Sequence, residues 1–364
     1  QHRDMAYIPS SADDGVGGHG PYHALPQQEY FKRTVAKLHT ERGMPNVMNF
    51  ESLSRTLRPS HLWPQNAVWG QHDYTLKGAQ RGESFNQLIA RTFGEPESAK
   101  QFTEWAQWIN YDGYRAMFES NHVSRAGLII WMSHPAFPSM VWQTYDYFLD
   151  PTAAFFACKK ACEPLHVQWN ALSDSIEVVN TRAGNHKKVR ACMQVFDVTG
   201  TLLKQKTKTL RSPEDTTLRC MKVKKPKKFS DVWFLRLSLQ EGKGAVVSEN
   251  TYVRSSEGSN WHALRTLPQA QVETSIRWDQ EHASISLRNS SSVPALMLRL
   301  QLLGSDGEQI LPVSFSDNYF HLMPGEKRTI EVSWKAEDTR GLQPHLIVAG
   351  MNVKDSLGSA LGLH

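Results

Sequence analysis

The 364-residue sequence has few features that would assign it to a class at once. Its four cysteines are too few at this length for a disulfide scaffold. No apolar run approaches the ~20 residues of a membrane-spanning helix, so we expect no membrane partner. The glycine-rich segment "DGVGGHG" has neither a preceding strand nor a following helix and does not match a nucleotide-binding fingerprint. We therefore expect no organic cofactor.

Metal-binding patterns are also missing. The histidines do not form an i, i+4 pair with a third ligand, so we predict no metal site. The cysteines are better interpreted as small buried residues, although a bridge between Cys192 and Cys220 across one sandwich stays open. The net charge of +5 comes largely from "KVKKPKK" (Lys222–Lys228), which lacks interleaved aromatic residues. We interpret this segment as a solvated loop and expect no nucleic-acid partner.

The first part of the chain mixes strands and helices. "RTVAKLHT" (33–40) is expected to be a strand, and Ser84 and Ser98, each followed by glutamine three residues later, fit the capping box of a helix start. Residues 98–121 carry apolar side chains at helical spacing and should bury one face. "AGLIIWMSH" (126–134) is a continuous apolar run, typical of a strand buried on both faces. This order favours a βα barrel or a doubly wound sheet.

Beyond about Pro164 the pattern is β throughout. Segments such as "SIEVVN", "VWFLRLSL", "ASISLRNSSS" and "RTIEVSW" alternate or run apolar between turn residues, as in antiparallel sandwiches. A plausible linker, Ser255–Trp261, separates two sets of strands. We predict an α/β part at residues 1–163 and two immunoglobulin-like β-sandwich domains at 164–256 and 257–364.

Glu41 is the first candidate for chemistry. It follows the strand predicted at 33–40, and Gly43 and Pro45 make the chain turn directly after it. In βα barrels the active site lies at the carboxyl ends of the strands. From spacing alone, however, an exposed surface glutamate is the simpler interpretation.

Many segments resemble one known family in sequence and order. They include "YIPSS", "GHGPYH", "TERGMPNVMNFESL", "LWPQNAVWGQHDY", "GLIIWMSHPAFPSMVWQTYDYFLDPTAAFF" and "SDNYFHLMPGE". Together they are similar to the carboxyl-terminal half of glycoside hydrolase family 2, in the branch of exo-β-glucosaminidases, β-mannosidases and endo-β-mannosidases. The resemblance implies the second half of a (β/α)8 TIM barrel followed by the two sandwiches.

The resemblance also implies site residues. The family's nucleophile falls on Glu41, with Thr40 where serine is commoner, and Trp131 falls on the tryptophan that floors the subsite of the cleaved sugar. Trp142, Asp146 and His39 are further expected substrate contacts. Phe137 stands where the family usually has tryptophan.

Retaining glycosidases need a second carboxylate, ~5–5.5 Å from the nucleophile. The family's acid/base follows an asparagine, and no Asn-Glu dipeptide occurs in this sequence. The expected function is therefore part of a retaining β-glycosidase for β-mannosides or β-glucosaminides, with β-galactosides next. We expect a companion chain or amino-terminal segment to supply the acid/base, and the resemblance favours a secreted or periplasmic protein. The alternatives are a non-catalytic carbohydrate-binding or scaffolding protein and, last, an oxidoreductase barrel.

Overall fold

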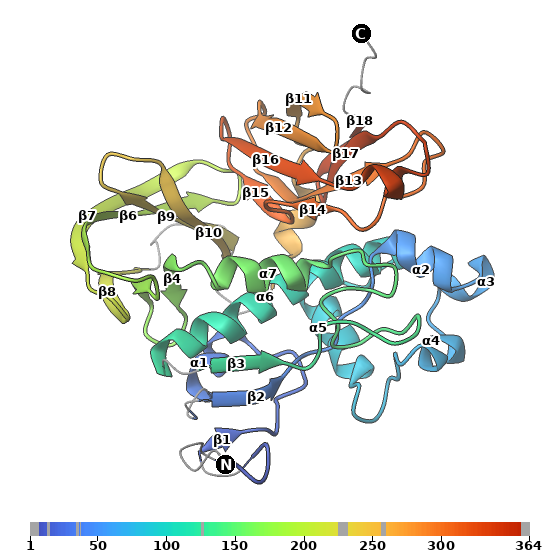
Figure 1. Ribbon diagram of the computed structural model, residues 1–364, viewed down its shortest axis with the longest axis horizontal. Coiled ribbons are helices and arrows are strands. Elements are labelled where there is room, and N and C mark those ends of the chain that lie inside the picture. The colour runs from blue at the N-terminus through green and yellow to red at the C-terminus, as the bar shows by residue number, and fades with distance from the viewer. Residues whose placement is uncertain are drawn as a thin grey trace.

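The computed structural model describes residues 7–12, 15–33, 36, 38–124, 127–224, 232–255 and 260–357 (Figure 1). Several segments singled out in the sequence lie partly outside these ranges. They include the predicted strands at 33–40 and 126–134, the lysine-rich segment Lys222–Lys228 and the linker Ser255–Trp261. Within the described ranges, no helix has both the length and the apolar character needed to span a membrane.

The first part contains a parallel sheet of three strands in the order β1-β2-β3, namely Val16–Gly17, Leu38–Arg42 and Gly127–Ile130. Parallel neighbours require long crossover connections, and helices supply them here. The helices are α1 (Gln27–Arg33), α2 (Phe50–Thr56), α3 (Pro59–Leu62), α4 (Ala67–Gln71), α5 (Gly82–Phe93), α6 (Ala99–Ser124) and α7 (Ala153–Ala161).

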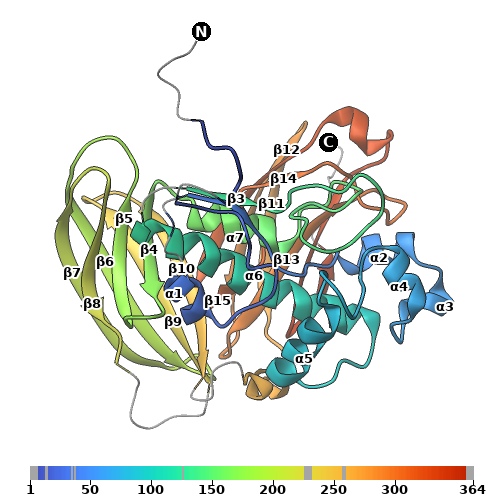
Figure 2. The ribbon, with the colours of Figure 1, turned by 90° about the horizontal axis from the view of Figure 1, so that it is seen from below.

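Helix α6 begins where the capping box predicts. The amide of Gln101 donates to Ser98 Oγ at 3.2 Å, and the Gln101 side chain accepts from the amide of Glu97 at 2.7 Å. The expectation of one buried face is wrong, because the middle of α6 is buried on nearly every side. The reason is its position: α6 lies between the parallel sheet and the two sandwiches (Figures 1 and 2).

The first sandwich is antiparallel. One sheet has the order β4-β5-β8 and the other the order β10-β9-β6-β7, and all of these strand pairs are antiparallel. Its core is a separate cluster of apolar side chains from both sheets, including Val167, Ile176, Val195 and Leu235. The strands are β4 (Leu165–Asn170), β5 (Ser175–Asn180), β6 (His186–Asp197), β7 (Leu202–Ser212), β8 (Thr216–Lys222), β9 (Val232–Glu241) and β10 (Val246–Ser255).

The second sandwich pairs a sheet of order β11-β12-β16-β14 with a sheet of order β15-β13-β17-β18. Its core is continuous with the core around α6, so it is fixed to the helical part by shared apolar packing. Its elements are η1 (His262–Thr266), β11 (Val272–Asp279), β12 (His282–Asn289), β13 (Ala295–Leu303), β14 (Ser314–Phe315), β15 (Phe320–Leu322), β16 (Lys327–Ser333), η2 (Ala336–Thr339), β17 (His345–Gly350) and β18 (Val353–Leu357).

Several expectations are corrected by the structure. Helix α5 begins at Gly82 rather than after Ser84, because Arg81 takes the N-cap position in a left-handed conformation. Strand β3 is not buried on both faces, because Ile129 is 56% exposed and the other residues of the strand are only partly covered. All four cysteines are free, and only Cys220 is buried, so no Cys192–Cys220 bridge forms.

Candidate active site

The end of β2 carries an irregularity that determines where Glu41 lies. His39 pairs with Leu128 of β3, and the next pair in the register joins Arg42 to Ile130. Strand β2 therefore fits one more residue into this interval than β3 does, which is the definition of a β-bulge. A bulge bends the strand and re-aims a side chain. Glu41 lies inside it and within the strand, rather than after the strand as the sequence suggested.

The Glu41 carboxylate is half-buried and is held by a tyrosine. The hydroxyl of Tyr22, in the segment between β1 and α1, donates a hydrogen bond to Glu41 Oε2. Burial of the phenol, together with its hydrogen bond to Glu41, raises the pKa of Tyr22 to about 12. Tyr22 therefore keeps its proton at neutral pH and remains a donor to the carboxylate.

The backbone beyond Glu41 is pinned to the end of β3. The amide of Trp131 donates to the carbonyl oxygen of Arg42 at 2.8 Å. Gly43 packs directly beside this contact, since a Cβ at residue 43 would lie 2.1 Å from the Trp131 carbonyl oxygen. The Trp131 side chain is 41% exposed at the same end of the sheet, and the peptide bond between Trp131 and Met132 is cis. Trp131 is therefore close to Glu41 through the backbone of residues 42 and 43.

Trp142 also lies at this end of the sheet. Its ring centroid is 6.1 Å from that of Tyr22, with the rings tilted by 59°. Trp142 has φ of 71°, a left-handed conformation that is unfavourable for such a side chain. Its carbonyl oxygen accepts from the amide of Met132 at 2.9 Å and from the Tyr114 hydroxyl at 3.1 Å, which holds this backbone in place. Its indole Nε1 is buried without a hydrogen-bond partner among the described residues.

His39 lies in β2 against β1. The ring fits there because residue 17 is glycine. A Cβ atom added at residue 17 would lie only 2.7 Å from His39 Nδ1. Neither ring nitrogen has a hydrogen-bond partner within the described part of the chain. Burial, aided by the charge of Arg42, lowers the pKa of His39 to about 4. The imidazole is therefore neutral at pH 7 and can both donate and accept.

Asp146 has a different environment from the other predicted site residues. Its Oδ1 accepts from the amides of Phe148 and Asp150, at 2.9 and 3.0 Å, and so shapes its own loop. Burial and the neighbouring Asp150 raise the pKa of Asp146 to about 7. These contacts link Asp146 to the domain interface rather than to Glu41.

That interface contains a partly buried ion-pair network. Arg299 of the second sandwich donates to Glu51 of α2 at 2.7 Å and to Asp150 at 2.9 Å. Asn49 and Gln309 donate to the same oxygen of Asp150, at 2.7 and 3.2 Å. The network joins the loop of Asp146 to the second sandwich, which gives this loop a structural role.

Tyr22 was not singled out from the sequence. It lies nineteen residues before Glu41 in the sequence. No sequence-spacing rule predicts that a residue in the segment after β1 contacts the end of β2. The segment "GHGPYH" contains it and was noted for its resemblance to the family, without a role for the tyrosine. In the described ranges, no three His, Cys, Asp or Glu side chains are grouped as a metal site would require.

Comparisons with known proteins agree with the predicted resemblance. A family model described as the exo-β-D-glucosaminidase Ig-fold domain matches residues 250–353. Exo-β-D-glucosaminidase of Streptomyces avermitilis is 27% identical over 390 residues, which cover 95% of this chain and 43% of that protein. The mannosylglycoprotein endo-β-mannosidase of Lilium longiflorum is 27% identical, with 81% of this chain and 38% of that protein covered.

A solved structure shows the same fold. The exo-chitosanase CsxA of Amycolatopsis orientalis superimposes with a TM-score of 0.85 at 23% identity, covering 96% of this chain and 46% of that one. This chain thus spans less than half the length of the relatives that it matches. The homologues are glycoside hydrolases.

Proposed function

We propose, from the premise that this chain is a homologue of exo-β-D-glucosaminidases and endo-β-mannosidases, that it is part of a retaining β-glycosidase. The substrates would be β-glucosaminides or β-mannosides, with β-galactosides next. The three parallel strands and their helices would form part of a (β/α)8 barrel, with Glu41 at the carboxyl end of one strand. The observation that carries the proposal is the Glu41 carboxylate held by Tyr22 beside Trp131 and Trp142.

In this proposal Glu41 attacks the anomeric carbon of the sugar. The leaving oxygen takes a proton from a second carboxylic acid, and a covalent glycosyl ester forms on Glu41. Water then attacks the anomeric carbon with the second carboxylate as general base, and Glu41 is released. The Tyr22 hydroxyl fixes the orientation of the attacking carboxylate and partly neutralises it before attack.

Two indoles and an imidazole are proposed to bind the sugar. The exposed Trp131 ring suits the apolar C–H face of a pyranose. The unpartnered Nε1 of Trp142 and the neutral ring of His39 offer hydrogen bonds to hydroxyl groups. Asp146 was expected as a further contact, but its place in the interface network supports a role in holding the loop instead.

The second carboxylate is proposed to come from polypeptide outside these 364 residues. Retaining chemistry places it ~5–5.5 Å from the nucleophile. Among the described residues, the Glu41 side chain accepts a hydrogen bond from Tyr22 and forms no ion pair. The family pattern Asn-Glu is also absent from the sequence.

The test is turnover of an aryl β-glycoside by the purified, assembled protein carrying Glu41→Gln. This change keeps the shape of the side chain and removes its charge, so we expect activity to be abolished. The matched control is Glu95→Gln, at an exposed position, which should retain normal turnover. Undiminished activity of Glu41→Gln would reject the proposal, and no turnover by the unaltered protein would favour the non-catalytic alternative.

A further inference from the structure

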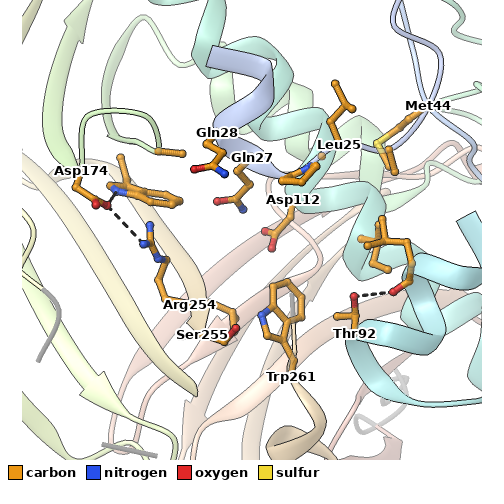
Figure 3. Close-up of a pocket in the computed structure, with 18 residues that line it drawn as sticks. Leu25, Gln27, Gln28, Met44, Thr92, Asp112, Asp174, Arg254, Ser255 and Trp261 are labelled. Carbon is orange, nitrogen blue, oxygen red and sulfur yellow. Dashed lines mark hydrogen bonds and ion pairs between the residues drawn. The ribbon is translucent and has the colours of Figure 1, made fainter. Parts of the chain in front are cut away.

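The first sandwich and helix α6 are incompletely packed against each other. A cavity of about 240 Å³ lies between them and α1, and its walls include Asp112 of α6, Trp169 of β4 and Arg254 of β10 (Figure 3). The interior core of the first sandwich is also a separate apolar cluster, whereas the core of the second sandwich is continuous with that around α6. Polar contacts therefore take a larger share in holding the first sandwich to α6.

About two turns after Asp112, a buried histidine of the sandwich meets α6. His166 of β4 is fully buried, with Nε2 3.2 Å from Glu119 Oε1 of α6 and Nδ1 3.2 Å from Glu163 Oε2 in the segment between α7 and β4. An ionised carboxylate only accepts hydrogen bonds, so both ring nitrogens carry a proton when both contacts are satisfied. We propose that Glu119, His166 and Glu163 form a proton-dependent latch, in which the imidazolium of His166 holds the first sandwich to α6 and its deprotonation releases the sandwich.

Other donors keep the two carboxylates in the accepting state. The Tyr252 hydroxyl of β10 donates to Glu119 Oε1 at 2.7 Å, and Lys160 Nζ of α7 donates to Glu163 Oε1 at 2.8 Å. Burial opposes ionisation of Glu163, but the hydrogen bonds and charges of His166 and Lys160 lower its pKa to about 2. Burial alone would likewise lower the pKa of His166, but its hydrogen bonds to Glu119 and Glu163 raise this pKa above the ordinary value.

Polar groups reach the ring from every element packed against it. Ser248 Oγ of β10 lies 3.3 Å from Nδ1, and Asn250 Nδ2, which donates to the Val167 carbonyl oxygen at 2.8 Å, lies 3.3 Å from Nε2. The His122 ring centroid is 6.0 Å from that of His166, and His122 Nε2 lies 2.7 Å from the Ala161 carbonyl oxygen. The titratable and charged groups around the latch are Asp112, Arg115, Glu119 and His122 of α6, Lys160 of α7, Glu163 after α7, Glu177 of β5 and Tyr252 of β10.

The latch is one end of a longer series of ion pairs. Lys160 also contacts Asp317 of the second sandwich at 3.5 Å, and Arg328 contacts Asp317 and Glu249 at 2.9 Å each. Acidic and basic groups alternate along the series, which runs Glu119, His166, Glu163, Lys160, Asp317, Arg328, Glu249. A neutral His166 would leave the carboxylate of Glu119, which is 1% exposed, without the cation that contacts it. An uncompensated charge is costly inside a protein, so loss of this proton weakens the junction.

The sign of the pH effect follows from the two states of the histidine. In the unfolded chain His166 titrates at its ordinary pKa of about 6.5, and in the folded chain its pKa is higher. The stability that the latch contributes is therefore fully present below about pH 6.5 and is lost as the pH rises through the raised pKa.

The first test is nuclear magnetic resonance of the purified, assembled protein labelled with ¹⁵N-histidine. We expect both ring nitrogens of His166 to be protonated at pH 7, and the ring to lose its proton at a higher pH than a free histidine side chain. The signals are assigned through their correlations with the His166 backbone, so the test does not depend on a variant. A single protonated ring nitrogen at pH 7, or titration no higher than that of a free side chain, would overturn the proposal.

The second test compares His166→Gln with the unaltered protein. Glutamine can donate to one carboxylate but carries no charge, so its thermal unfolding midpoint should be lower at about pH 6 and should fall less steeply between about pH 6.5 and pH 9. Hydrogen exchange of the β4 and β10 amides at pH 7 should rise by about 10- to 150-fold, as loss of a hydrogen bond to a charged group predicts.

His282→Gln is the matched control, because it makes the same change at an exposed position of β12 and should alter neither measurement. The proposal is overturned if the midpoint of His166→Gln falls with pH as steeply as that of the unaltered protein. It is also overturned if exchange in β4 and β10 is unchanged, or if exchange rises equally in β12 of the second sandwich. Neither measurement requires turnover of a glycoside, so the outcome is independent of the proposed function.

Discussion

Gly43→Ala tests whether close packing behind Glu41 positions the nucleophile. The added Cβ would lie 2.1 Å from the carbonyl oxygen of Trp131, whereas a carbon–oxygen contact normally needs about 3.3 Å. The clash is with backbone, so no side-chain rotation relieves it. The ends of β2 and β3 must separate by about 1.2 Å, directly beside Glu41. A displacement of ~1 Å in a catalytic group costs about 100-fold in rate, and overpacking costs ~1–3 kcal/mol of stability.

The assay is kcat for an aryl β-glycoside, together with the thermal unfolding midpoint. We expect kcat to fall by about 100-fold with a drop of only a few degrees in the midpoint. Gly70→Ala in α4 is the control, because its Cβ would lie 3.6 Å from Thr75 in ordinary contact. If Gly43→Ala turns over substrate at the unaltered rate, the claim that this junction positions Glu41 is refuted.

Three further substitutions test other parts of the account. Tyr22→Phe removes a hydrogen bond to the Glu41 carboxylate, and such a bond to a charged group contributes ~1.5–3 kcal/mol. We therefore expect kcat/KM to fall by about 10- to 150-fold while the thermal unfolding midpoint is retained. An unchanged kcat/KM would contradict this role of Tyr22. Burial and the nearby carboxylate raise the pKa of Asp146 from 3.8 to about 7, so the stability that this group contributes is fully present below about pH 4 and is lost as the pH rises to about 7. Asp146→Asn should therefore flatten the fall of the thermal midpoint between about pH 4 and pH 7, and an equally steep fall would show that this group does not carry it. Arg299→Met leaves the buried carboxylate of Asp150 and the partly exposed carboxylate of Glu51 without their cation. It should cost ~3–5 kcal/mol in denaturant unfolding, whereas a loss below ~1 kcal/mol would mean that the network contributes little.

The sandwiches were predictable from the sequence because alternation has a direct structural cause. In β12, buried and exposed residues alternate along the strand, as period-two patterning requires. The end of β2 was less predictable. Its bulge arises from pairing with β3, which is about ninety residues away, and local propensity does not encode such a register. The sequence therefore identified Glu41 as a candidate but not the geometry of its strand.

Tertiary placement explains the other failures. Burial of β3 on both faces was inferred from its apolar run, yet burial depends on what covers the strand, and Ile129 stays exposed. The role of Tyr22 depends on a contact between the segment that follows β1 and the end of β2. Such a contact leaves no periodic signal in the chain. Asp146, which was matched by resemblance, accepts hydrogen bonds from two amides of its own loop, and sequence spacing did not predict these contacts.

Covalent trapping is the most direct test of the central claim that Glu41 forms a bond to the sugar. The purified, assembled protein is incubated with a 2-deoxy-2-fluoro-β-mannoside that carries an activated leaving group, digested, and examined by mass spectrometry. The account predicts one added fluorosugar on the peptide containing Glu41, and none in Glu41→Gln. An adduct on a different carboxylate of this chain, or labelling that persists in Glu41→Gln, would contradict it.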